Sequence, residues 1–334
     1  MPAAPNRPSR RPDLVYYPDT APGIRRQRRG RGFSYIAPDG TTIARGAERQ
    51  RIEALAVPPA YCDVWICPKP DGYLQATGRD ARARKQYRYH PDWTAYRSLH
   101  KYDHLADFGA ALPRIRRRIL QDLKGDPGDR DFAIAAVLAL LDRASMRIGN
   151  PEYARENGTF GATTLRPRHV SLSGSEIKLH YPAKGGHKVR KTLRDATLNR
   201  TLARLDDLPG TSLVAWVDEA GAPHQVTSDA VNTRLVDLTG QEAVTAKTFR
   251  TWNGSVAALE AALGPGKRTI TAMAEAAAAR LHNTPAIARN SYIHPAVTEL
   301  TDEDAGDRVE RLKEVESRSG LRRAEAQLLA LLQG

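Results

Sequence analysis

The stretch "RHVSLSGSEIKLHYPAKGGHKVRKTL", residues 168–193, decides the fold class of this chain. It has β character, and turn residues around Ser173-Gly174 and at Lys184-Gly185-Gly186 divide it into three strands. Helical patterns precede and follow it along the chain. The stretch therefore predicts an α+β fold in which a three-stranded sheet is set into a larger, mainly α-helical domain.

The flanking helical patterns are long and apolar on one side. Helical spacing runs through 105–123 and 130–149 before the sheet, and it returns in 225–262 and in an Ala-rich segment at about 267–282. The apolar run "FAIAAVLALL" is ten residues long with Asp at both ends, too short to cross a membrane, so it predicts a buried core helix. A charged amphipathic segment closes the chain.

The first third of the chain has a different pattern. Short segments such as "DVWICP", "YLQATGRD" and "KQYRYH" are separated by turns, and Asp39-Gly40 predicts a hairpin. We expect a small N-terminal antiparallel β-sheet domain there. The predicted organisation is a basic flexible arm at 1–30, a β-rich domain at 31–99, and an α-rich domain with a C-terminal amphipathic segment at 100–334.

Charge is concentrated in the same third. The net charge is +13, and residues 1–105 carry +9 of it, which suits a polyanion such as nucleic acid or an anionic membrane. The N-terminus has no apolar run typical of a secretory signal. Cys62 and Cys67 have no second pair to complete a zinc site, and we expect reduced thiols. With no phosphate-binding loop and no convincing metal-ligand spacing, we expect an activity that needs neither nucleotide nor metal.

Near the C-terminal end, "TPAIARNSYIHP" raises the possibility of covalent chemistry. Thr284 is a good N-cap with Pro285 at the first helical position, so Tyr292 falls on a new helix. A phenol has a pKa near 10, so an attack on phosphorus needs cationic donors to stabilise the oxyanion and the phosphate oxygens. The leaving alkoxide needs a proton from a general acid.

The chain offers cationic candidates where turns meet regular structure. Arg147 is expected to end a buried helix in "SMRIGNPEY", and Lys184 lies at a hairpin tip beside two glycines. Lys247 and Arg250 are three residues apart in "KTFRTWNGS", hence on one face of a helix. Each of these residues taken singly fits a surface or capping role, and only their combination indicates a site.

The ordered set "RIGN", "AKGG", "KTFRTWNG" and "NTPAIARNSY" resembles the catalytic residues of type IB DNA topoisomerases, in particular the short poxvirus-like branch found in bacteria. The segment "GRDARARKQYRYH", residues 78–90, resembles the part that those enzymes place in the DNA major groove. The resemblance extends over approximately residues 33–300. It implies a fold like that of tyrosine recombinases and type IB topoisomerases.

The resemblance also implies roles. Tyr292 would attack to form a 3′-phosphotyrosyl link, Arg147 and Arg250 would clamp the scissile phosphate, and Lys184 would protonate the 5′ oxygen. Strand rotation and religation would then relax supercoils without ATP, metal or another cofactor. The residues that would contact DNA are Lys85, Gln86, Tyr87, Tyr89 and Lys247. The expected partner is double-stranded DNA, clamped by a monomer in the cytoplasm at the nucleoid, with no membrane role.

One position departs from the commoner family pattern. Where most members have His nine residues before the tyrosine, this chain has Asn283, with His282 beside it. An Asn amide can still donate a hydrogen bond to a phosphate oxygen, although it cannot titrate, and we favour Asn283 over His282 for the catalytic set. Two alternatives stay open: a tyrosine recombinase or integrase, which usually has His where this chain has Lys247, and a non-catalytic basic DNA-binding protein.

Overall fold

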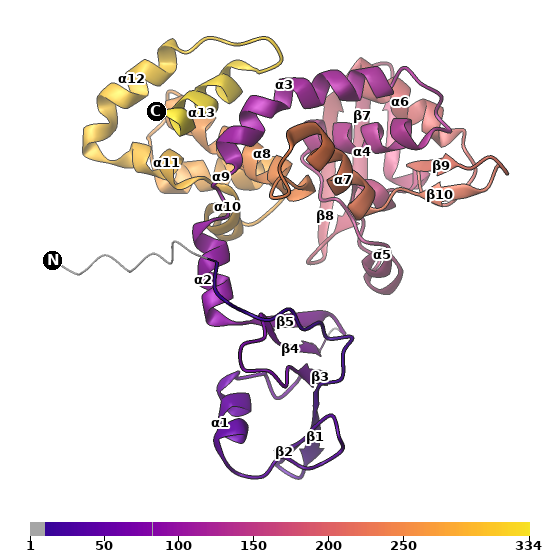
Figure 1. Ribbon diagram of the computed structural model, residues 1–334. Helices are drawn as coiled ribbons and strands as arrows, with labels where there is room; N and C mark the ends of the chain where they lie inside the picture. Colours follow the sequence, from indigo (N-terminus) through magenta and orange to yellow (C-terminus); the bar gives the residue numbers. More distant parts are fainter. Residues whose placement is uncertain (1–10, 82) are drawn as a thin grey trace. The chain divides into compact units, whose positions relative to one another are not determined.

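The fold was analysed in a computed structural model that describes residues 11–81 and 83–334. The chain divides into two compact units between Tyr102 and Asp103 (Figure 1). The first unit is built on an antiparallel sheet and the second is mainly helical with a smaller sheet, which confirms the predicted α+β fold class.

The N-terminal unit is a five-stranded antiparallel sheet with the strand order β2-β1-β3-β4-β5. Its elements are β1 (Ile24–Arg29), β2 (Gly32–Ile36), α1 (Ala47–Ala54), β3 (Cys62–Ile66), β4 (Leu74–Arg79), β5 (Lys85–Tyr89) and α2 (Pro91–Leu99). One face of the sheet packs against Ile52 of α1, where Ile24 and Ile66 are among the buried residues. The unit thus has a small core of its own.

The prediction of a flexible arm up to residue 30 is wrong for its second half, and its first ten residues lie outside the described part. Residues 24–29 form β1, because Ile24 enters the core and the guanidinium of Arg26 donates to the carbonyls of Val57, Pro58 and Tyr61. The Pro- and Arg-rich composition suggested an arm, whereas the half-buried Arg26 and the buried Ile24 hold a strand here. Helix α1 was also not predicted. The predicted turn at Asp39-Gly40 is confirmed, with Gly40 at φ 89°.

The second unit carries the predicted three-stranded sheet in the order β6-β7-β8, with both predicted turns. Its strands are β6 (Val170–Ser173), β7 (Glu176–Ala183), β8 (His187–Arg194) and the short hairpin β9 (Ala215–Val217) and β10 (Pro223–Gln225). Its helices are α3 (Leu105–Asp122), α4 (Arg130–Ala144), α5 (Pro151–Asn157), α6 (Ala196–Asp206), α7 (Ser228–Thr239), α8 (Ala246–Leu263), α9 (Ile270–Leu281), α10 (Pro285–Tyr292), α11 (Pro295–Thr298), α12 (Gly306–Glu314) and α13 (Arg323–Gln333). The hairpin β9–β10 and helix α6 were not predicted.

Helices α4 and α8 form the centre of this unit. Almost every side chain of α4 is buried, which confirms the core-helix prediction for the apolar run. Phe108 of α3 packs edge-on against Phe249 and Trp252 of α8, with ring centroids 4.9 and 5.9 Å apart. Within the described residues, no helix is both long enough and apolar enough to span a bilayer.

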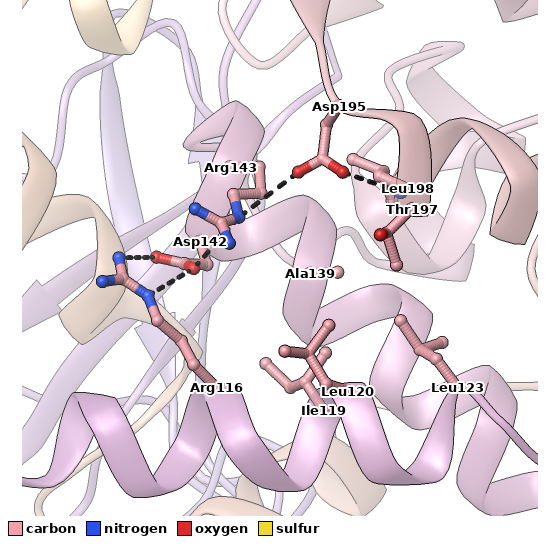
Figure 2. Close-up of a pocket in the computed structure, with 10 residues that line it drawn as sticks. All are labelled: Arg116, Ile119, Leu120, Leu123, Ala139, Asp142, Arg143, Asp195, Thr197 and Leu198. Carbon is pink, nitrogen blue, oxygen red and sulfur yellow. Dashed lines mark hydrogen bonds and ion pairs between the residues drawn. The ribbon is translucent and has the colours of Figure 1, made fainter. Parts of the chain in front are cut away.

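A buried ion cluster ties the C-terminal helix to this core. The guanidinium of Arg116 on α3 donates to both carboxylate oxygens of Asp142 on α4, at 2.9 and 2.8 Å (Figure 2). The same guanidinium donates to both oxygens of Glu325 on α13, at 2.8 Å each. Arg116 therefore links the consecutive helices α3 and α4 to α13, which is distant in the sequence.

Candidate active site

Tyr292 is the last residue of α10, and helix α8 holds its backbone. The hydroxyl of Thr284 accepts from the amide of Ile287 at 3.3 Å, and Pro285 follows it, which confirms the predicted N-terminus of this helix. A Cβ placed on Gly254 of α8 would come within 2.8 Å of the Tyr292 carbonyl oxygen, so glycine permits this close approach. The Ser255 hydroxyl donates to the same carbonyl at 3.2 Å.

Arg250 lies against the ring of Tyr292. Its side chain is only 4% exposed, and its guanidinium carbon is 5.1 Å from the Tyr292 ring centroid. One terminal nitrogen donates to the Ser145 carbonyl at 2.5 Å and the other to the Leu281 carbonyl at 3.0 Å. The Nε atom of Arg250 is buried, and among the described residues it has no hydrogen-bond partner. The guanidinium interacts with the Tyr292 phenol without a hydrogen bond of good geometry, so Nε can donate to an anionic ligand beside that phenol.

Arg147 and Asn283 are 136 residues apart in the sequence, and their side chains are hydrogen-bonded to each other. Arg147 does not end α4 as expected but lies three residues beyond it, because Ser145 takes a left-handed conformation with φ 54°. Its carbonyl accepts from the Ala162 amide at 2.9 Å, which anchors the loop. Its Nη2 donates to the Asn283 Oδ1 at 2.5 Å. Within the described chain, the buried Nδ2 of Asn283 has no partner, so it is a second donor available to a ligand.

The charges around Tyr292 favour its ionised form. Burial raises the pKa of the phenol, but the cationic groups of Arg250, Arg147 and Lys247 outweigh it, and the net shift is downward. Burial also lowers the pKa of Arg250, and the like charge of Arg147 adds to this effect. A cluster of cations around one phenol and two unpaired donors is suited to an anionic, oxygen-rich ligand.

The two predicted lysines are less constrained. Lys184 is exposed at the β7–β8 turn, where Gly185 and Gly186 have φ of 87° and 80°. In the described part of the chain no contact joins Lys184 to Tyr292 or to the arginines, so its predicted role stays a prediction. Lys247 is exposed on α8, one turn before Arg250, and its charge contributes to the lowered pKa of Tyr292.

The predicted DNA-contact residues of the first unit lie on β5, an edge strand of the sheet. Tyr87 and Tyr89 share one face, are 41% and 45% exposed, and stack with ring centroids 6.2 Å apart. Strand alternation puts Gln86 on the other face, where it donates to Asp80 at 3.0 Å. Lys85 forms an ion pair with Asp19 at 2.7 Å.

Sequence reasoning missed Lys191 of β8. Its Nζ donates to the carbonyls of Ala144 and Arg280, at 2.8 and 3.2 Å, next to the Ser145 and Leu281 carbonyls that Arg250 bonds. Lys191 and Arg250 thus join the C-terminal ends of α4 and α9, whose negative dipole ends favour cations. The chain continues from these ends to Arg147 and Asn283. The sequence did contain a signal for Lys191, because it is a lysine at an inward-facing position of a strand with alternating side chains.

Lys191 gives a pH-dependent prediction. Burial, with Arg280 and Arg250 nearby, lowers its pKa to about 8, whereas an unfolded lysine titrates near 10.4. Between these values the unfolded chain binds more protons, so the free energy of unfolding contributed by this group rises with pH. From pH 8 to 10, the free energy of unfolding of the parent protein should rise by about 1–2 kcal/mol relative to that of Lys191→Met, allowing for partial solvent screening. Urea unfolding of both proteins across this range measures the gap, and a constant gap would contradict the assignment.

No metal centre accompanies these groups in the part of the chain that is described. Residues 11–81 and 83–334 contain no cluster of three His, Cys, Asp or Glu side chains placed to hold an ion. Cys62 is exposed and Cys67 is buried, and both are free thiols.

Comparison with known proteins gives the class and then the family. Residues 32–80 match the model of the bacterial DNA topoisomerase IB N-terminal domain, and residues 90–304 match that of the eukaryotic DNA topoisomerase I catalytic core. Both models describe DNA topoisomerases, which is the class of enzyme. The chain belongs to the type IB DNA topoisomerase family, and the first match fits its bacterial branch.

Individual relatives that are similar to this chain are also DNA topoisomerases. DNA topoisomerase 1B of Acanthamoeba polyphaga mimivirus is 28% identical over 293 residues, which cover 83% of this chain and 87% of the relative. DNA topoisomerase 1B of Vaccinia virus (strain Copenhagen) is 25% identical over 107 residues, or 32% of this chain and 34% of that protein. The mitochondrial DNA topoisomerase I of Rattus norvegicus is 27% identical over 173 residues, or 49% and 26%. The protein is thus a type IB DNA topoisomerase that acts on DNA.

Proposed function

We propose that this enzyme relaxes supercoiled duplex DNA through a transient 3′-phosphotyrosyl link to Tyr292, without ATP or metal. The observation that carries the proposal is the pair of buried donors without a partner, Nε of Arg250 and Nδ2 of Asn283, in the cationic cluster around this phenol. A scissile phosphate has the acceptor oxygens that both donors lack.

The reaction follows from these groups. The Tyr292 oxygen gives its proton to solvent and attacks phosphorus, and the bond from phosphorus to the 5′ oxygen breaks. Arg147 and Arg250 stabilise the charge that develops on the non-bridging oxygens, with Asn283 as a neutral donor. Lys184 gives a proton to the leaving 5′ oxygen. After strand rotation the steps reverse, and because the phosphotyrosyl bond conserves the energy of the cleaved bond, no ATP is consumed.

Covalent trapping is the direct test. Plasmid DNA is incubated with enzyme in EDTA without ATP, the reaction is stopped with denaturant, and the trapped DNA ends are sequenced. We expect relaxed plasmid and protein attached to 3′ ends, with 5′-hydroxyl ends free. Attachment at 5′ ends, or relaxation that depends completely on Mg²⁺, would overturn the proposed chemistry.

Lys184 has its own prediction as the general acid. Lys184→Ala should slow single-turnover cleavage by roughly 10²- to 10⁴-fold, the usual contribution of proton transfer. A 5′-bridging phosphorothiolate should largely restore the rate, because a thiolate leaves without a proton. Exposed Lys178 on β7 offers a control, since Lys178→Ala should cleave both substrates at the parent rate. Equal slowing of Lys184→Ala on both substrates would remove Lys184 from the acid role.

Two finer points belong to the same proposal. We expect a monomer that closes around the duplex as a clamp and that is located in the cytoplasm at the nucleoid, supported by the basic first third of the chain.

The recombinase alternative predicts strand exchange between paired recognition sites and no relaxation of a plasmid that lacks them. Plasmid relaxation by the purified protein therefore separates the two functions.

A further inference from the structure

The β1–β2 hairpin carries basic side chains that the mechanism above does not use. Arg25, Arg28 and Arg29 of β1 are exposed, and no ion pair involves them in the part of the chain that the structure describes. Arg26 is different, because its guanidinium is occupied by three backbone carbonyls. The hairpin lies at the opposite side of the sheet from β5.

Strand register decides which face each arginine occupies, because residues directly opposite each other across a sheet share a face. Arg25 is opposite Trp65 of β3, Trp65 is opposite Thr77 of β4, and Thr77 is opposite Tyr87 of β5. Arg25 therefore lies on the same face as Tyr87. With a period of two, Arg29 and Tyr89 lie there too. We call this the outer face.

The other face is the one that packs on the core. Ile24 is opposite Ile66, and Ile66 is opposite Ala76, all three in the buried cluster with Ile52 of α1. Arg28 belongs to this inner face by alternation, and it is exposed near the hairpin tip. Neighbouring arginines in one strand thus point to opposite sides of the sheet.

The centre of the outer face is covered by the chain before β1. Tyr17 stacks on Trp65 with ring centroids 6.2 Å apart, and the indole nitrogen donates to the Ala21 carbonyl at 2.9 Å. Tyr16 of this segment is 73% exposed and stacks on Tyr73, which in turn stacks on Tyr89. A row of aromatic rings and two unpaired arginines therefore lies on one side of the sheet.

The spacing across this face matches one groove of DNA. Three strand intervals of about 4.8 Å separate β1 from β5, or about 14 Å in all. The major groove is about 12 Å wide, and phosphates line both of its edges. We propose that Arg25 and Arg29 bind backbone phosphates of the same duplex that Tyr87 and Tyr89 contact, across its major groove. This inference rests on the proposed DNA contacts of β5.

The test compares two variants of the full-length enzyme, Arg25→Ala/Arg29→Ala on the outer face and Arg28→Ala on the inner face. Binding to a duplex of about 30 base pairs is followed by fluorescence anisotropy from about 50 to 200 mM KCl, where the logarithm of affinity falls by about 0.9 per phosphate contact for each tenfold rise in salt. We expect the double variant to lose about 1.8 from this slope and to bind roughly 30-fold more weakly near 0.15 M salt. Arg28→Ala should keep the parent slope.

Two results would overturn the inference. An unchanged slope in the double variant would mean that neither arginine touches a phosphate. The second contradicting result is a salt slope that Arg28→Ala lowers as much as the double variant does for each arginine removed. The slope would then reflect the overall positive charge of the hairpin and not contacts on one face. The readout is equilibrium binding, so it holds even if Tyr292 is not the nucleophile. Failure of the proposed chemistry would instead show as no covalent adduct in the parent enzyme.

Discussion

Tyr292→Phe should bind DNA but form no covalent adduct and relax no plasmid, with a loss of roughly 10⁴-fold or more, as expected when a nucleophile is removed. The substitution deletes one oxygen and keeps the ring against Arg250, so the fold and the cationic pocket are retained. Gel detection of protein-linked DNA after denaturation measures the adduct, and anisotropy confirms that binding persists.

Tyr181 of β7 is the matched control. It is buried and feels the charges of Arg250 and Arg147, yet burial raises its pKa to about 12, so its hydroxyl stays protonated. Tyr181→Phe should still form the adduct. Undiminished relaxation by Tyr292→Phe, or loss of the adduct only in Tyr181→Phe, would assign the nucleophile to another residue.

Arg116→Ala should destabilise the C-terminal unit by about 3–5 kcal/mol, the usual cost of removing one partner from a buried ion cluster. The change leaves the carboxylates of Asp142 and Glu325 buried without their shared cation, and Glu325 is fully buried. Burial raises the pKa of Glu325, but the hydrogen bonds and charges of Arg116 and Arg322 outweigh this effect and lower the pKa to about 2. The melting temperature should fall by roughly 10 °C for a unit of this size.

Arg118→Ala on the same helix is the control for this prediction. Arg118 pairs with Asp122 at 2.7 Å, but its side chain is 39% exposed, so its loss should cost less than about 1 kcal/mol. Calorimetry of both variants makes the comparison. Equal and small effects would mean that water reaches the cluster around Arg116 and screens it.

Much of the local structure could be predicted from the sequence. Glycine at the turns of the three-stranded sheet, the N-cap Thr284 with Pro285, and the apolar pattern of α4 all act between residues close in the chain. The order of the basic motifs around Tyr292 was sufficient for the family. The prediction of a flexible arm failed at a local feature too. The density of charge suggested an arm at residues where Ile24 and Arg26 are part of a strand.

The candidate site was likewise predictable from the sequence only in part. The sequence identified Arg147, Arg250, Asn283 and Tyr292 as a set, but it could not say which donors are satisfied by the protein. Arg147 reaches Asn283 across 136 residues, and Arg116 reaches Glu325 across 209. The role of Lys191 likewise depends on two helix ends brought together by folding.

By itself, then, the sequence determined the α+β class, the family and the identity of the candidate nucleophile, because short-range patterns and ordered motifs carry that information. Only the tertiary structure decided that Lys191 and Arg250 join two helix ends, that Nε of Arg250 and Nδ2 of Asn283 stay free, and that Arg25 shares a face with Tyr87. The physical reason is that hydrogen-bond satisfaction and strand register are settled between residues distant in the chain, where no local pattern records the partner.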